Sequence, residues 1–212
     1  MHIQTKLHMW WTWTAIAIRN AAAAQRCRRG MVTPNSFESE NSASLSLEFE
    51  YSISSIAAVA FAMEALSKEI EGGGHNLDES GFEKPTNTTR GFYVALRIVQ
   101  AFDLEGEVAQ NLPYKMNELF HLRNNSVHFE SKYQSGVHPH PSGTKTAYEH
   151  TIYTYEKSLE AVQLAVEVLK QCTKSAQQTK YHSAAMDAAK AMPGVLAMLE
   201  EIIDVEDLQG VE

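Results

Sequence analysis

Hydrophobic residues recur every three or four positions along most of the chain, and this spacing predicts amphipathic helices. Strict alternation of apolar and polar residues occurs at 45–51, where a short strand is the alternative to a helix. The pattern therefore predicts an all-α protein, a bundle of five or six helices. The expected helices cover about residues 5–29, 46–71, 88–102, 114–128, 146–174 and 182–203.

Glycine, proline and polar residues interrupt this pattern. Segment 31–44 is rich in Ser, Asn and Glu and has no helical periodicity, so it is predicted to be a linker. The glycines at 72–74 are expected to end one helix, and the prolines and glycines of 130–145 predict a loop. Pro113 is expected in the first turn of the helix over 114–128, because its missing N–H costs nothing there.

The first helix differs from the others because it is basic and rich in tryptophan. Its apolar run is too short to span a membrane, and Arg19 interrupts it before the small residues that a signal peptide requires. We expect an appendage or the first helix of the bundle, with a signal peptide or a membrane-surface helix as alternatives. The predicted organisation is this N-terminal helix over 1–30, a linker over 31–44, a helical domain over 45–205 and an acidic tail over 206–212.

Composition narrows the class of protein. The chain has 212 residues, of which 44% are hydrophobic and 21% charged, as in an ordinary globular protein. Cys27 and Cys172 are expected to be reduced thiols of a cytoplasmic protein, with a single disulfide as the alternative. The formal charge of −8 excludes broad electrostatic binding of nucleic acid and leaves room for a local basic site. One such site would be an RNA clamp formed by Arg26, Arg28 and Arg29.

One predicted helix places polar, chemically capable side chains on a single stripe. Asn117, His121, Asn124 and His128 are spaced four, three and four residues apart, so they share one face of a helix. Arg123 lies at the edge of this stripe, and its long side chain can reach the imidazole of His128. The opposite stripe is apolar and is predicted to face the core; it consists of Met116, Leu119, Phe120 and Val127.

The run from Arg123 to His128 resembles the RNase motif of HEPN domains (higher eukaryotes and prokaryotes nucleotide-binding). In that family four to six residues separate an Arg from a His, and a polar residue comes straight after the Arg; here four residues separate Arg123 from His128, and the polar residue is Asn124. The resemblance covers roughly residues 88–174. It implies a bundle of four or five helices and a two-fold dimer that brings two copies of the motif together. Some toxin members carry a tyrosine two or three residues after the His, where they are inactivated. Here the nearest tyrosine after the motif is Tyr133, five residues after His128.

The same residues fit metal-independent cleavage of RNA. An imidazole such as that of His128 can donate or accept a proton near neutral pH, and the guanidinium of Arg123 can bind a phosphate with two donors. Asn124 would orient the imidazole or contact the phosphate. The predicted catalytic residues are thus Arg123, His128 and Asn124. The predicted substrate-binding residues are His121, Asn125 and Asn117.

The predicted function is that of an RNA endonuclease in toxin–antitoxin or antiviral defence, a role implied by the resemblance alone. The expected partners are RNA, a second copy of the chain and possible antitoxin or defence proteins, with no membrane, cofactor or metal. A metal site at His138 and His140 is the alternative in the loop. Two alternatives remain for the function: a non-catalytic module that binds RNA, nucleotide or protein, and a structural bundle with Arg123 paired to Glu118 or Glu130.

Overall fold

The computed structural model describes residues 9–31, 38–72, 89–127, 138–143 and 145–175, and the single positions Pro193 and Ala197. His128, the acidic tail and the rest of the helix predicted over 182–203 lie outside these residues. The elements are α1 (Met9–Arg29), α2 (Glu38–Gly72), α3 (Arg90–Ala101), α4 (Gly106–Val127), β1 (His138–Pro139), β2 (Lys145–Thr146), α5 (Tyr148–Ile152) and α6 (Tyr155–Ser175). The prediction of an all-α bundle is confirmed.

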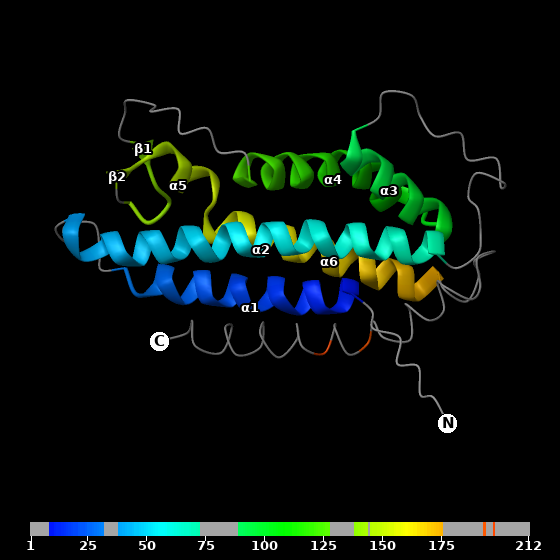
Figure 1. Ribbon diagram of the computed structural model, residues 1–212, viewed down its shortest axis with the longest axis horizontal. Helices are drawn as coiled ribbons and strands as arrows, with labels where there is room; N and C mark the ends of the chain where they lie inside the picture. Colours follow the sequence, from blue (N-terminus) through cyan, green and yellow to red (C-terminus); the bar gives the residue numbers. More distant parts are fainter. Residues whose placement is uncertain are drawn as a thin grey trace.

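The long helix α2 runs through the middle of the bundle, and the other long helices pack around it (Figure 1). Helix α1 lies antiparallel to α2 along most of its length and also contacts α6. Helices α3 and α4 pack against each other on the side of α2 away from α1. Helix α1 is therefore a helix of the bundle, one of the two possibilities that the sequence left open.

Small residues let α1 and α2 approach closely. Ala17 on α1 is fully buried, and its carbonyl accepts a hydrogen bond of 2.9 Å from the Ser55 hydroxyl of α2. Ala58 and Ala60 of α2 are also buried. Within the described residues, one segment, Ser42–Ile70, is apolar and long enough to cross a membrane. Half of its most apolar window is buried in the bundle, and a core helix meets the same criterion.

Two helix starts differ from the prediction. Helix α2 begins at Glu38, inside the segment 31–44 predicted as a linker, and it also excludes the strand considered at 45–51. A helix whose later turns are packed can extend into polar residues at little cost. Helix α4 begins at Gly106, so Pro113 lies in its interior and not in its first turn. Burial of Leu112 and Met116 beside the proline offsets the hydrogen bond that it removes.

The helix predicted over 146–174 is broken into α5 and α6. Tyr153, at the break, is 1% exposed, and its hydroxyl donates a hydrogen bond of 2.9 Å to the carbonyl of Leu122. The Thr154 hydroxyl accepts a hydrogen bond from the N–H of Lys157 at 3.4 Å, which caps the new helix. Before α5, the predicted loop contains the short hairpin β1–β2, in which His138 pairs with Thr146.

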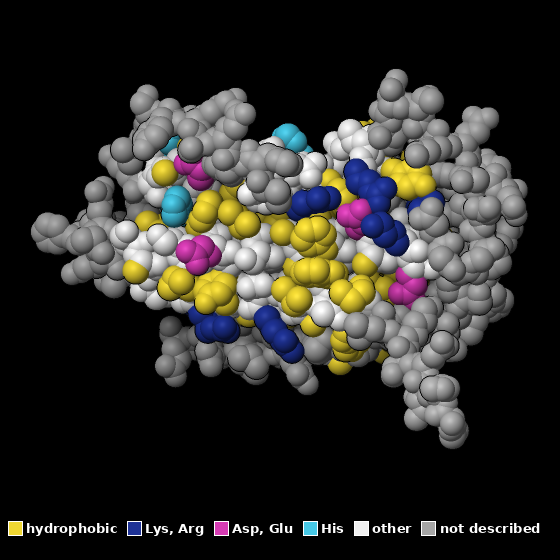
Figure 2. Space-filling model, viewed as in Figure 1, with side chains coloured by type: hydrophobic (Ala, Val, Ile, Leu, Met, Phe, Trp, Pro, Cys, Tyr) yellow, Lys and Arg dark blue, Asp and Glu magenta, His cyan; other side chains and the backbone are white. Residues whose placement is uncertain are grey.

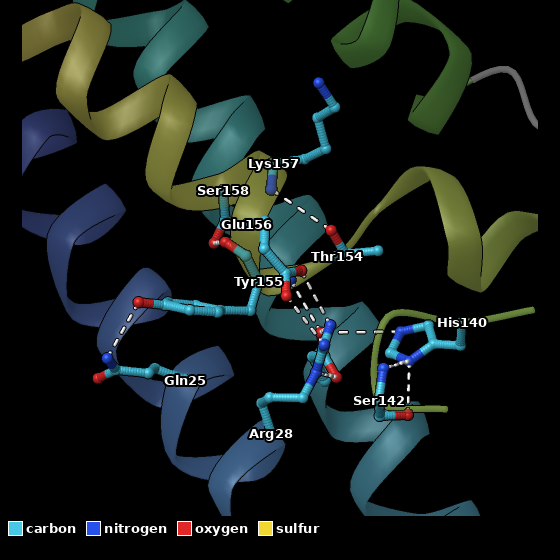
Figure 3. A network of polar contacts seen from close by, with 10 residues as sticks. Gln25, Arg28, His140, Ser142, Thr154, Tyr155, Glu156, Lys157 and Ser158 are labelled. Carbon is cyan, nitrogen blue, oxygen red and sulfur yellow. Dashed lines mark hydrogen bonds and ion pairs between the residues drawn. The ribbon is translucent and has the colours of Figure 1, made fainter. Parts of the chain in front are cut away.

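A buried carboxylate on α2 ties this helix to α1 and α6. Figure 3 labels its partners Arg28 and Tyr155. Glu48 of α2 is 1% exposed, and both of its oxygens accept hydrogen bonds from the guanidinium of Arg28 on α1. Arg28 also donates to both oxygens of Glu156 on α6, at 2.9 and 3.0 Å. The N–H of Tyr155 donates to Glu48 at 2.8 Å. The charge of Glu48 is thus compensated by partners from two other helices.

His140 reaches the same network from the loop after β1. It is 4% exposed; its Nδ1 lies 2.8 Å from the Ser142 hydroxyl and its Nε2 lies 3.8 Å from Glu48. Burial lowers the pKa of His140, and the positive charge of Arg28 adds to the lowering, while Glu48 and Glu156 oppose it. The imidazole is therefore neutral near pH 7 in the folded protein.

This environment predicts a pH-dependent stability. The pKa of His140 in the folded protein is below the unfolded value of 6.5. The unfolded chain therefore binds more protons than the folded protein as the pH falls through 6.5. The stabilisation is present above pH 6.5 and lost below it. We expect the urea midpoint of the parent to fall more between about pH 7.5 and about pH 5.5 than that of His140→Gln. His138→Gln, a change on the partly exposed neighbour, is the control. Equal falls in the parent and His140→Gln would contradict this prediction.

A second prediction concerns the crossing of α3 and α4. A Cβ atom at Gly91 would lie 2.6 Å from the carbonyl oxygen of Met116 and 2.7 Å from the Cα of Asn117. Helix propensity alone predicts that Gly91→Ala stabilises the protein by about 1 kcal/mol. We expect instead a loss of about 1–3 kcal/mol in the free energy of unfolding, because backbone cannot yield as a side chain can. Urea denaturation measures it, with the exposed Gln100→Ala of α3 as control, and stabilisation by Gly91→Ala would contradict it.

Candidate functional site

Helix α4 carries the predicted motif, and its apolar stripe faces the core. Met116, Leu119 and Phe120 are buried, with at most 3% exposure, as their spacing predicted. The side chain of Val127 lies outside the described residues. This burial fixes the rotation of α4 about its own axis. The helical spacing then determines the direction of the other side chains of the motif.

Part of the predicted polar stripe of α4 is directed to solvent. His121, Asn124 and Asn125 are exposed, and the Nε2 of His121 lies 3.2 Å from the side-chain nitrogen of Asn125. Asn117 is engaged elsewhere, because its side-chain oxygen accepts a hydrogen bond from the Thr89 hydroxyl at the start of α3. His121 and Asn125 are therefore close together, while Asn117 links α4 to the start of α3 through its hydrogen bond with Thr89.

Arg123 points away from this stripe, toward α2. Its guanidinium lies over the rings of Phe61 and Phe120, 5.4 and 5.1 Å from their centres, and its Nη2 is 3.7 Å from a carboxylate oxygen of Glu64. Each helical residue advances by about 100°, so Arg123 is turned well away from its neighbour Asn124. The described contacts of Arg123 are thus with α2 and with Phe120 of its own helix. Its convergence with Asn124 and His128 stays a prediction, because His128 lies outside the described residues.

The acidic partner of Arg123 is also not the predicted one. It is Glu64 of α2, not Glu118, and Glu130 lies outside the described residues. The separation of 3.7 Å is that of a weak ion pair, longer than a hydrogen bond. The Nε of Arg123 is buried and makes no hydrogen bond with the described part of the chain. The guanidinium is thus held mainly by two aromatic faces.

Three cations meet at Glu64. Arg90 of α3 donates to Glu64 Oε1 at 2.7 and 3.2 Å, and Lys68 and Arg123 each approach the carboxylate to 3.7 Å. We call Glu64, Lys68, Arg90 and Arg123 the Glu64 cluster. It has a formal excess of two positive charges, and Figure 2 shows dark blue side chains on both sides of a magenta one on this face. A chain with a net charge of −8 thus carries a local basic site.

Two hollows adjoin α4 or the Glu64 cluster. The first, about 650 Å³, is a groove between α4 and α6. Its floor contains Leu112, Leu119 and Leu122, and its rim carries more acidic than basic residues. The second, about 450 Å³, lies between the start of α1 and α2, beside Phe61 and Glu64.

Several other predicted sites have a structural role. Arg28 pairs with Glu48 and Glu156, so its guanidinium has a structural role. An RNA clamp of Arg26, Arg28 and Arg29 stays a prediction. Both cysteines are free, as expected, and burial raises the pKa of the Cys172 thiol. His140 bonds to Ser142, and the described residues contain no group of three side chains suited to a metal ion.

Sequence reasoning missed Glu64, Arg90 and Phe61 as parts of the site. The one local signal was the spacing of Glu64 and Lys68, which is that of an ion pair on a helix.

Comparisons with protein-family models, with curated proteins and with solved structures find no match for this chain. The resemblance to HEPN domains therefore rests on the run from Arg123 to His128 and on the helical fold.

Proposed function

We propose that this chain is a metal-independent RNA endonuclease of the HEPN type. One observation carries the proposal: Arg123 lies over two aromatic rings, beside a cluster in which cations outnumber carboxylates. Such a guanidinium is positioned in advance and retains donors for a phosphate. Aromatic rings beside cations are also typical of surfaces that bind single-stranded nucleic acid.

The proposed reaction is transfer of the phosphodiester to the neighbouring 2′-hydroxyl. The 2′-oxygen forms a bond to phosphorus, and the bond from phosphorus to the 5′-oxygen breaks, which leaves a 2′,3′-cyclic phosphate and a 5′-hydroxyl. Arg123 neutralises the charge that develops on the phosphate oxygens. His128 removes or supplies a proton, and Asn124, exposed one turn earlier, contacts the substrate.

A second imidazole is required if one removes the proton and another supplies it. In the proposed mechanism it comes from a second copy of the chain in a two-fold dimer, as the HEPN resemblance implies. His121 is the alternative within the same chain, because its ring is exposed on α4 beside Asn125. A cytoplasmic location is consistent with two free cysteines. The role in toxin–antitoxin or antiviral defence rests on the resemblance alone.

A second candidate function is a non-catalytic interaction module. The groove between α4 and α6 favours it, because an apolar floor with a net acidic rim suits an amphipathic helix that carries basic residues. The orientation of Arg123 toward Glu64 also fits a module whose arginine stabilises the fold. In that case the protein would not cleave RNA. Leu164→Glu, a change in the floor of the groove, would abolish binding of a basic partner helix.

The nuclease proposal predicts a specific pattern of RNA cleavage. In EDTA, the purified chain should cut total RNA and tRNA and leave 2′,3′-cyclic phosphate ends. Arg123→Ala and His128→Ala should each reduce the rate at least roughly 100-fold, because each removes a charge or proton-transfer group from the transition state. The rate of product formation on denaturing gels measures the effect.

Controls separate catalysis from folding. Each variant is checked by circular dichroism and for its association state, and Lys115→Ala, an exposed change on α4, is the matched control. Cleavage that is absent from the parent, or equal in parent and both variants, contradicts the nuclease and favours the interaction module. Cleavage that requires a divalent cation would also contradict the metal-independent mechanism.

A further inference from the structure

The hollow between α1 and α2 has walls of mixed chemistry. Its apolar part comes from Trp13 and Met9 of α1 and from Phe61 and Ala65 of α2, and its polar part from Glu64, Lys68 and Glu69. The rings of Trp13 and Phe61 are 5.0 Å apart at an angle of 42°, and both side chains are partly exposed. Two aromatic side chains thus border an open space of about 450 Å³.

This hollow is continuous with the Glu64 cluster. Phe61 lines the hollow and also lies beneath the guanidinium of Arg123. Glu64 and Lys68 line it as well, and both belong to the cluster. A ligand bound in the hollow would therefore lie next to the cations that surround Glu64.

We propose that this hollow binds an unpaired nucleobase of single-stranded RNA, which stacks on Trp13 and lies against Phe61 while its phosphate lies toward Arg123 and Arg90. The proposal rests on the RNA-binding function proposed above. Planar bases stack on tryptophan and phenylalanine regardless of sequence, and unpaired bases are the ones that such pockets can reach.

The distribution of charge sets the direction of the nucleotide. Glu64 and Glu69 border the hollow, so a phosphate there would meet carboxylates as well as Lys68. The N–H groups of a base can instead donate a hydrogen bond to the carboxylate of Glu69. Arg90 and Arg123 contact the oxygens of Glu64 from α3 and α4. The base therefore belongs in the hollow, and the phosphate belongs on the side of the two arginines.

The test compares an intact single-stranded RNA oligomer with an abasic oligomer that carries the same phosphates. Fluorescence anisotropy at fixed salt gives both affinities for the full chain. The parent is expected to bind the intact oligomer roughly ten-fold more tightly than the abasic one. Trp13→Ala should lose this preference, and Trp13→Phe should retain most of it because it keeps an aromatic face. Trp11→Ala removes a neighbouring tryptophan and is the control.

Each outcome decides a different point. Equal affinity of the parent for intact and abasic oligomers would overturn the stacking site and leave the RNA-binding proposal in place. A Trp13→Ala variant that is folded by circular dichroism and still prefers the intact oligomer would also overturn it. Failure of the parent to bind either oligomer would contradict the proposed RNA function and the stacking site.

Discussion

The buried carboxylate of Glu48 is the constraint on which the arrangement of the helices depends. An ionised carboxylate inside a bundle is costly unless it is paired and hydrogen-bonded. Arg28 of α1 and the N–H of Tyr155 at the start of α6 supply those bonds. Removal of Arg28 would leave the charge of Glu48 without compensation, so the network specifies how α1, α2 and α6 meet. It also explains why α6 starts at Tyr155.

The same helix carries a second carboxylate with a different balance of charge. Glu64 lies 16 residues after Glu48, about 24 Å further along α2 at the usual helical rise. Glu48 and Glu156 share Arg28, so acids outnumber arginines there, whereas cations outnumber the carboxylate at Glu64. In the first arrangement Glu48 is buried, and the second arrangement is partly exposed, as the proposed binding of a phosphate requires. An acidic chain can therefore present a basic site on one face.

Helical periodicity was enough to predict most of the bundle. The burial of Met116, Leu119 and Phe120 follows from local spacing, as does the exposure of His121. The break before α6 could not be predicted, because it depends on Glu48 from a distant part of the chain. Nor could the starts of α2 and α4, since tertiary packing decides how far a helix extends past its apolar positions.

The candidate site was predicted only in part, for a related reason. The motif identified Arg123, but the direction of its side chain is set by Phe61 and Glu64, which lie on another helix. Sequence spacing within α4 carries no information on those contacts. The contribution of Arg90 likewise appears only when α3 packs beside α2. Ion pairs between helices are thus the part of the site that could not be predicted from the sequence.

The cations around Glu64 are proposed to bind RNA phosphates. The most direct measurement is the salt dependence of RNA affinity for the parent and for Glu64→Gln, with Glu160→Gln on α6 as a control of equal charge change. Removal of the Glu64 carboxylate frees Arg90, Arg123 and Lys68, so the account predicts tighter binding and a steeper decline of log K with log salt, by about 0.7 per phosphate gained. Binding that is weaker or unchanged in Glu64→Gln, with an unchanged slope, would contradict the account.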